Sequence, residues 1–88
     1  MAWTVEYDPR VDKVLRGLDR QVAKKIVDYL DGVAALNDPR SRGKALTGRL
    51  AGLWRYRIGD WRAICDLQDN KLVVVVLEVG HRSEIYDH

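Results

Sequence analysis

The stretch LWRYRIGDWRAICDL, residues 53–67, constrains the fold of this chain more than any other segment. On each side of Gly59-Asp60, large apolar side chains alternate with charged or small ones, which is the period of half-buried strands. Glycine at the first central position of a two-residue loop suits a type II′ turn, because that turn needs a positive φ there. We therefore predict a β-hairpin in which Ile58 pairs with Trp61.

The predicted register sorts the hairpin side chains onto two faces. Counting back from the turn pairs Arg57 with Arg62 and Arg55 with Ile64, so the three arginines share one face. We expect the other face to form the core, and its residues are Trp54, Tyr56, Ile58, Trp61, Ala63 and Cys65.

Arginines directly opposite each other destabilise a sheet by up to about 1 kcal/mol. In one interpretation, these long side chains splay into solvent or reach a carboxylate such as Asp66. In the other, they form an anion site, because a guanidinium group binds phosphate through a planar fork of donors.

The segments before the hairpin predict a strand and two helices. Alternation favours a strand over 3–7, and Asp8-Pro9 is typical of a helix start. Apolar residues then recur at spacings of three and four over 20–36, which predicts a second, amphipathic helix capped by Asp19.

The remaining segments predict a loop, a turn and a last strand. Residues 37–45 are turn-rich and basic, as in a solvated loop, and Asp69-Asn70 favours a tight turn. The β-branched run 72–79 predicts a central strand that is buried on both faces. The resulting order is β-α-α-β-β-β, a small α+β fold in which a two-helix hairpin covers one face of an antiparallel sheet and the arginine side stays open.

The composition limits the classes of protein that this chain can belong to. Its 88 residues predict a single domain over 1–88, and 47% hydrophobic and 32% charged residues are typical of a folded protein. The net charge is only +2, but basic residues concentrate from Arg40 to Arg62, where Asp60 is the only acid. The single cysteine, Cys65, excludes an internal disulfide, and we expect it to be buried.

No apolar run has membrane-spanning length, and we see no signal peptide, phosphate-binding glycine loop or spaced Cys/His metal site. We therefore expect a cytoplasmic protein with no metal and no membrane contact.

Three segments together resemble the RelE group of bacterial toxins, in the RelE/ParE superfamily. They are KALTG at 44–48, the hairpin WRYRIGDWR at 54–62 and the ending VGHRSEIY at 79–86, and the resemblance spans almost the entire chain. It implies a RelE-like fold and a toxin of a type II toxin–antitoxin system: an endoribonuclease that cuts messenger RNA in the ribosomal A site and so inhibits translation.

The resemblance also implies a mechanism and a set of partners. In the RelE group, a 2′-hydroxyl of the substrate attacks the adjacent phosphate, which requires no metal and no cofactor. The partners are the ribosome, messenger RNA and a cognate antitoxin, with which the chain forms a hetero-oligomer. We expect the antitoxin to neutralise the basic face or to cover apolar surface near the helices.

Carried onto this sequence residue by residue, the resemblance points to a site on the open face of the sheet, where basic side chains hold the RNA and stabilise the charged phosphorane. The catalytic candidates are Arg57, Arg62, Arg82 and Tyr86, and the substrate-binding candidates are Arg55, Lys44 and His81.

The sequence leaves open which residue acts as the general base. Relatives often have lysines at the positions of Arg55 and Arg57, and a lysine on a crowded basic face can act as a base, whereas a guanidinium keeps its proton. His81 is the obvious substitute because imidazole transfers protons near neutral pH. A bulge at Gly80 would decide whether His81 or Arg82 faces the site.

Two alternative functions remain. The ParE branch of the same fold inhibits DNA gyrase by binding and cuts no RNA, but the set of Arg62, Arg82 and Tyr86 favours the RNA-cleaving branch. A basic RNA- or ribosome-binding module without catalysis is the other alternative. It predicts binding that weakens steeply with salt, and no cleavage products.

Overall fold

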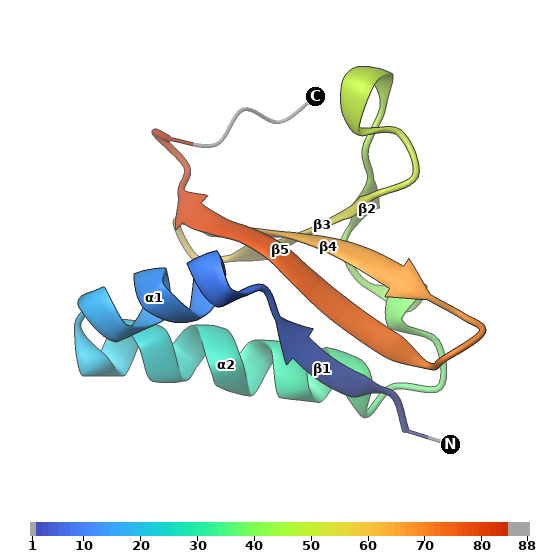
Figure 1. Ribbon diagram of the computed structural model, residues 1–88, viewed down its shortest axis with the longest axis horizontal. Helices are drawn as coiled ribbons and strands as arrows, with labels where there is room; N and C mark the ends of the chain where they lie inside the picture. Colours follow the sequence, from blue (N-terminus) through green and yellow to red (C-terminus); the bar gives the residue numbers. More distant parts are fainter. Residues whose placement is uncertain (1, 85–88) are drawn as a thin grey trace.

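The computed structural model describes residues 2–84, and two helices lie on one face of a five-stranded sheet (Figure 1). The helices are α1 (Pro9–Gly17) and α2 (Arg20–Ala34), and the strands are β1 (Thr4–Tyr7), β2 (Lys44–Ala45), β3 (Trp54–Ile58), β4 (Trp61–Gln68) and β5 (Val73–His81). Short 3-10 turns, η1 (Pro39–Ser41) and η2 (Gly48–Leu50), flank β2. The predicted α+β fold is confirmed, with the two-residue strand β2 as an addition.

The strand order is β1-β5-β4-β3-β2, and the sheet is mixed, because β1 runs parallel to β5 while the other neighbours are antiparallel. The path of α2 explains this difference from the predicted antiparallel sheet. This helix ends beside the start of β1, where the Trp3 N–H donates to the Ala34 carbonyl at 2.8 Å. β3 runs in the same direction as β1. The two chain reversals from β3 through β4 to β5 restore that direction, so β5 is parallel to β1.

Both helices begin at the predicted residues. The Asp8 side chain accepts a hydrogen bond from the Arg10 N–H, and the Asp19 side chain accepts one from the Gln21 N–H. Apolar residues of both helices pack on the inner face of the sheet and form the main core, which includes Val11, Ile26, Leu30, Val33, Tyr56, Ala63, Cys65, Val74, Val76 and Val79.

The predicted register of the β3–β4 hairpin is confirmed at every pair, from Ile58 with Trp61 to Trp54 with Cys65. Gly59 has a φ of 61°, as a type II′ turn requires. The β4–β5 connection is longer than predicted. It contains four residues, Asp69 to Leu72, and Leu72 adopts the left-handed conformation with a φ of 54° before β5 begins.

β5 contains a β-bulge at Leu77. Ile64 pairs with Glu78 and Cys65 pairs with Val76, so Leu77 is the extra residue on β5. The bulge lies three residues before the predicted position, Gly80. β5 is central, as predicted, but its outer face is only partly buried, since Leu77 is half-buried and Glu78 is exposed.

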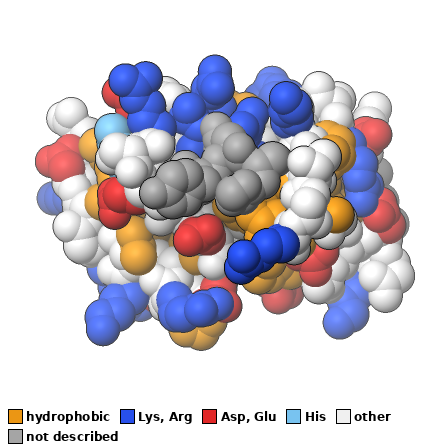
Figure 2. Space-filling view, turned by 90° about the horizontal axis from the view of Figure 1, so that it is seen from above, with side chains coloured by type: hydrophobic (Ala, Val, Ile, Leu, Met, Phe, Trp, Pro, Cys, Tyr) orange, Lys and Arg blue, Asp and Glu red, His pale blue; other side chains and the backbone are white. Residues whose placement is uncertain are grey.

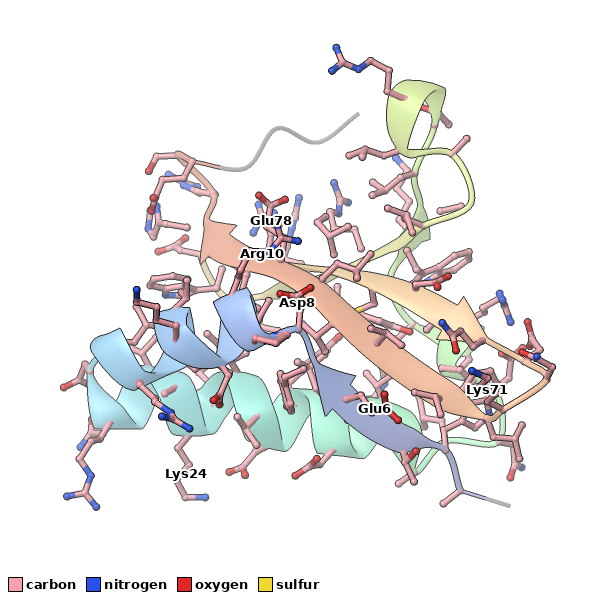
Figure 3. The ribbon with its side chains drawn as sticks, viewed as in Figure 1. Glu6, Asp8, Arg10, Lys24, Lys71 and Glu78 are labelled. Carbon is pink, nitrogen blue, oxygen red and sulfur yellow. The ribbon has the colours of Figure 1, made fainter. Side chains whose placement is uncertain are left out.

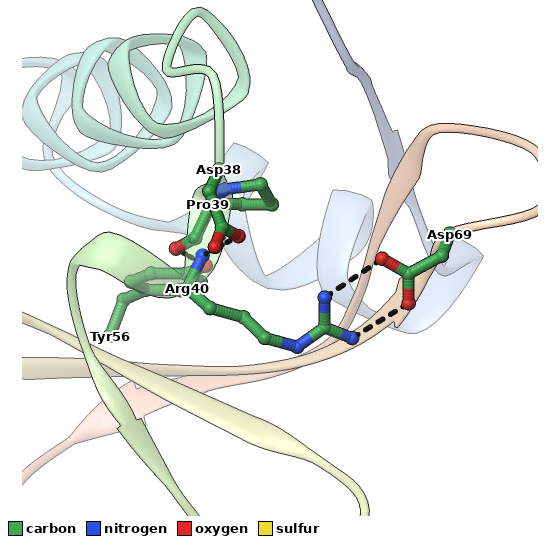
Figure 4. Close-up of polar contacts among 5 residues, drawn as sticks. All are labelled: Asp38, Pro39, Arg40, Tyr56 and Asp69. Carbon is green, nitrogen blue, oxygen red and sulfur yellow. Dashed lines mark hydrogen bonds and ion pairs between the residues drawn. The ribbon is translucent and has the colours of Figure 1, made fainter.

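The segment over 38–43, which we call the strap, is exposed except at Pro39, as predicted for a solvated loop, but it is also fixed to the sheet (Figure 4). The Tyr56 hydroxyl donates to the Pro39 carbonyl at 2.7 Å, and the Trp54 indole donates to the Arg42 carbonyl at 2.7 Å. The Arg40 guanidinium binds both carboxylate oxygens of Asp69 at 2.9 Å (Figure 4). These contacts hold the chain that leads into β2 against the edge of β3.

Candidate functional site

The predicted arginine cluster lies on the sheet face away from the helices. Arg57 and Arg62 are direct partners across β3 and β4, and Arg55 is flanked by Lys44 on β2. Figure 2 looks onto this side of the molecule, and Lys and Arg side chains gather along one edge of the view. We call Lys44, Arg55, Arg57 and Arg62 the arginine face.

These side chains differ in exposure. Arg57 is exposed, Arg55 is half-buried, and Arg62 is only 7% exposed. A buried charge is costly unless hydrogen bonds compensate for its lost hydration. The Arg62 Nη1 donates to the carbonyls of Gly59 at 3.3 Å and Trp61 at 3.2 Å. The β3–β4 turn therefore holds the Arg62 guanidinium in place.

Arg82 reaches the same end of the sheet. Its N–H donates to the Asp60 carbonyl at 2.7 Å, and its Nη1 lies 3.9 Å from the Asp60 carboxylate. Because of the bulge at Leu77, alternation along the end of β5 places Gly80 opposite Arg62, and Arg82 is the first residue after the strand. The structure thus brings Arg82 beside the turn that holds Arg62.

His81 is not brought to the arginine face. It is the direct partner of Trp61, on the core side of the sheet, and the two rings meet edge to face with centroids 5.5 Å apart. The His81 Nδ1 contacts Ser83 instead. Tyr86, the remaining catalytic candidate, lies outside the described residues.

A small flap, residues 46–53, covers part of the face that was expected to stay open. Leu46 of the flap is buried against Ile64 of β4, with Leu50 and Leu53 packed around them. Two features of the sequence indicate this cover. Ile64 is an apolar residue on the same face as the arginines, and the flap carries leucines at 46, 50 and 53 that can pack on it.

Between this flap and α1 lies a surface hollow of about 480 Å³. It is lined by Arg10, Val11, Val14, Leu50, Leu53, Ile64, Leu77, Glu78 and Val79. Arg10 and Glu78 supply its charged groups, and Figure 3 shows these two side chains on the same side of the sheet.

The groups whose pKa is raised by burial lie in the core and not at the arginine face. Burial raises the pKa of the Cys65 thiol to about 12, which makes it inert as a nucleophile, and burial also raises the pKa of Tyr7 to about 12. Within residues 2–84, no group of three or more His, Cys, Asp or Glu side chains could hold a metal ion. No helix in this described part is long and apolar enough to cross a membrane.

What this face can do follows from its charge. It presents three guanidinium groups on one face of the hairpin, and the carbonyls of Gly59 and Trp61 hold one of them, that of Arg62. Such an arrangement suits the binding of phosphate and the stabilisation of negative charge.

Comparison with known proteins agrees with the resemblance. The family model described as the ParE toxin of type II toxin-antitoxin system, parDE, matches residues 5–86. Toxin RelG of Mycobacterium tuberculosis is 30% identical over 86 residues, which cover 98% of each chain. A chain of the toxin-antitoxin complex RelBE2 from the same organism superposes with a TM-score of 0.84 at 27% identity, over 96% of this chain and 95% of that one. The archaeal RelE-RelB complex from Pyrococcus horikoshii matches with a TM-score of 0.73 at 25% identity, over 97% of this chain and 100% of that one.

Proposed function

The chain belongs to the RelE/ParE superfamily of type II toxins, and from this membership we propose that it is an endoribonuclease that cuts messenger RNA in the ribosomal A site. The observation that carries the proposal is the direct pairing of Arg57 with Arg62, with Arg82 beside the same turn. Such a cluster of like charges costs stability and is explained by an anionic substrate.

The proposed reaction needs charge stabilisation more than covalent chemistry. The 2′-hydroxyl of the messenger RNA loses its proton to solvent as its oxygen bonds to the adjacent phosphorus, and the bond from phosphorus to the 5′-oxygen breaks. The 5′-oxygen takes up a proton from solvent, so the products are a 2′,3′-cyclic phosphate and a 5′-hydroxyl, with no net change in protons. Negative charge builds on the phosphorane in between, where Arg57, Arg62 and Arg82 act as fixed donors. Arg55 and Lys44 bind neighbouring phosphates. Tyr86 stacks on an RNA base, and its hydroxyl forms a hydrogen bond with a base or a phosphate, which Tyr86→Phe would remove.

The turn of the hairpin supports this assignment. A donor stabilises a transition state best when its position is set before the reaction. The two carbonyls that bind the Arg62 guanidinium provide this preorganisation, and the exposure of Arg57 leaves it accessible to the 2′-hydroxyl and the phosphate.

Primer extension on a defined message in a purified translation reaction tests the proposal. Wild type should give cuts at A-site codons only when ribosomes are present, and these should weaken in Arg57→Ala, Arg62→Ala and Tyr86→Phe. The matched control is Arg16→Ala, which removes an exposed arginine on α1 that forms an ion pair with Asp12, on the far side of the sheet from the arginine face. An intact message with wild type would exclude the nuclease.

The family description itself favours a second candidate. The matching family model is named for ParE, and ParE-branch toxins inhibit DNA gyrase by binding. A gyrase supercoiling assay with the same preparation separates the two: the nuclease leaves supercoiling unchanged, whereas a ParE-like toxin stops it and leaves the message intact. RNA binding without either effect would indicate the non-catalytic module.

We also propose that the chain works in the cytoplasm, where ribosomes are, and is held inactive by a cognate antitoxin in a hetero-oligomer. The solved relatives include complexes named for toxin and antitoxin. Co-expression with the protein encoded beside this chain should yield a stable complex and suppress message cleavage. A freely active toxin in that co-expression would contradict the proposal.

A further inference from the structure

His81 is the one candidate site residue among those described that the geometry turns away from the arginine face. It ends β5, packs its ring edge to face on Trp61, and is half-buried. The residue that follows it, Arg82, belongs to the proposed site. We therefore ask which hydrogen bonds the His81 side chain forms with the backbone next to it.

The His81 side chain closes the turn over residues 81–84. Its Nδ1 accepts a hydrogen bond from the Ser83 N–H at 3.3 Å and lies 3.0 Å from the Ser83 hydroxyl. The Ser83 N–H can only donate, so Nδ1 is the acceptor in that bond. The His81 carbonyl accepts from the Glu84 N–H at 2.8 Å, which completes the turn.

Arg82 is the second residue of this turn, and its side chain extends into solvent. On the hairpin side, its N–H is bound by the Asp60 carbonyl at 2.7 Å. On the other side, the next peptide is held by His81 Nδ1 through the Ser83 N–H. Arg82 is thus fixed at both flanking peptides although its side chain is 66% exposed.

We propose that His81 is a positioning residue: its Nδ1 fixes the 81–84 turn so that Arg82 meets the phosphate beside Arg62. The inference rests on the proposed nuclease function for its kinetic consequence, and it assigns His81 neither a proton transfer nor a contact with RNA. A displacement of a charged donor by about 1 Å is enough to lower a rate by as much as 100-fold.

Two substitutions separate the positioning role from the alternatives. His81→Asn places Oδ1 at the same distance along the side chain as Nδ1, so the acceptor for the Ser83 N–H is kept while the ring and its capacity for proton transfer are lost. His81→Phe keeps a ring against Trp61 and loses the acceptor. Ser83→Ala serves as an intermediate case, because it removes the hydroxyl and retains the N–H.

Kinetics of A-site cleavage give the first readout. We expect kcat to fall about tenfold in His81→Phe with KM nearly unchanged, and to stay within about threefold of wild type in His81→Asn. Equal, large losses in both variants would show that the imidazole itself reacts and would overturn the inference. A wild-type rate in His81→Phe would overturn it as well.

Amide hydrogen exchange gives a second readout that does not depend on any activity. The Arg82 N–H, bound to Asp60, should exchange at least about tenfold faster in His81→Phe than in wild type, and more slowly in His81→Asn than in His81→Phe. Unchanged exchange in His81→Phe contradicts the positioning role even where the protein cleaves RNA. Failure of wild type to cleave, with the expected exchange pattern, would remove the proposed function and leave the structural role of His81 standing.

Discussion

At the scale of the residue, the two partnered arginines of the hairpin do different work. Arg62 is buried and spans two carbonyls of the turn, whereas Arg57, directly opposite, is exposed. A guanidinium has several donors in a planar fork, while an ammonium is a compact point charge on a flexible stem. The two positions should therefore respond differently to the same conservative change.

We predict that Arg62→Lys lowers the rate of message cleavage by at least about tenfold, and that Arg57→Lys retains most of it. Single-turnover cleavage on programmed ribosomes measures both. An equal response of the two variants would show that the carbonyls of Gly59 and Trp61 do not define the role of Arg62.

The ion pair between Arg40 and Asp69 makes stability depend on pH. The hydrogen-bonded Arg40 guanidinium holds the pKa of the Asp69 carboxyl below its ordinary value of 3.8. Because the pKa is lowered in the folded state, the pair stabilises the protein above the unfolded pKa, and the stabilisation is lost as the pH falls through the folded one.

We therefore predict that Asp69→Asn unfolds at lower urea concentration than wild type at neutral pH, and that the difference shrinks as the pH falls below about 4. Urea unfolding followed by tryptophan fluorescence at a series of pH values measures this. A difference that is constant with pH would mean that the loss comes from the turn and not from the charge.

At the scale of the element, the strap depends on a glycine that touches the sheet. Gly43 has a φ of 78°, and a Cβ there would lie 2.5 Å from the Arg55 carbonyl oxygen. Gly32, inside α2, has no positive φ, and a Cβ there would meet no atom within 4 Å. The two glycines form a matched pair.

Gly43→Ala should destabilise the protein by about 2 kcal/mol or more, because it combines an unfavourable φ with a backbone clash. Gly32→Ala should stabilise it by up to about 1 kcal/mol through helix propensity. Chemical denaturation measures both changes. Equal effects of the two substitutions would mean that the strap is not closely packed on β3.

Elements set by local chemistry could be predicted from the sequence. Asp8 and Asp19 are typical N-cap residues and indicate where the two helices begin. The register of the hairpin follows from the position of the Gly59-Asp60 turn. The strap and the flap were not predicted, since both depend on contacts with β3 and β4 that are distant in sequence. The flap left only an indirect signal, the apolar Ile64 in the row of the arginines. The parallel pairing of β1 with β5 was missed for the same reason, because it depends on where α2 ends.

The candidate site also has a part that could be predicted from local sequence and a part that could not. The pairing of Arg57 with Arg62 is local and was predicted, whereas the side taken by His81 depends on how β5 accommodates one extra residue against β4. A continuous run of valines does not indicate where such a residue falls.

At the scale of the whole molecule, the separation of charge is more informative than the net charge of +2. On the helices, basic side chains are paired with acidic ones, such as Arg16 with Asp12 and Lys24 with Asp28. The cluster of arginines lies on the opposite side of the sheet. Binding to a polyanion should therefore be governed by one face.

If about four phosphates of a single-stranded message are neutralised, the logarithm of the binding constant should fall with the logarithm of salt concentration with a slope of about −3. Arg57→Ala should reduce the magnitude of this slope by about 0.7, and Arg16→Ala should leave it unchanged. Fluorescence anisotropy with a labelled RNA at several salt concentrations measures the slopes. Equal reductions in the two variants would mean that RNA contacts both sides of the protein.

The bulge at Leu77 fixes the register of the end of β5. If Leu77 paired with Ile64, so that no residue was left over, every later residue of β5 would change faces, and the His81 imidazole would turn to the face of Arg57 and Arg62. Removal of Leu77 would not have this effect, because Glu78 to His81 would keep their present partners. One unpaired residue thus decides whether this end of the strand offers a permanently charged donor or a group that can give and take a proton, so the choice between electrostatic and acid–base chemistry lies in the strand register.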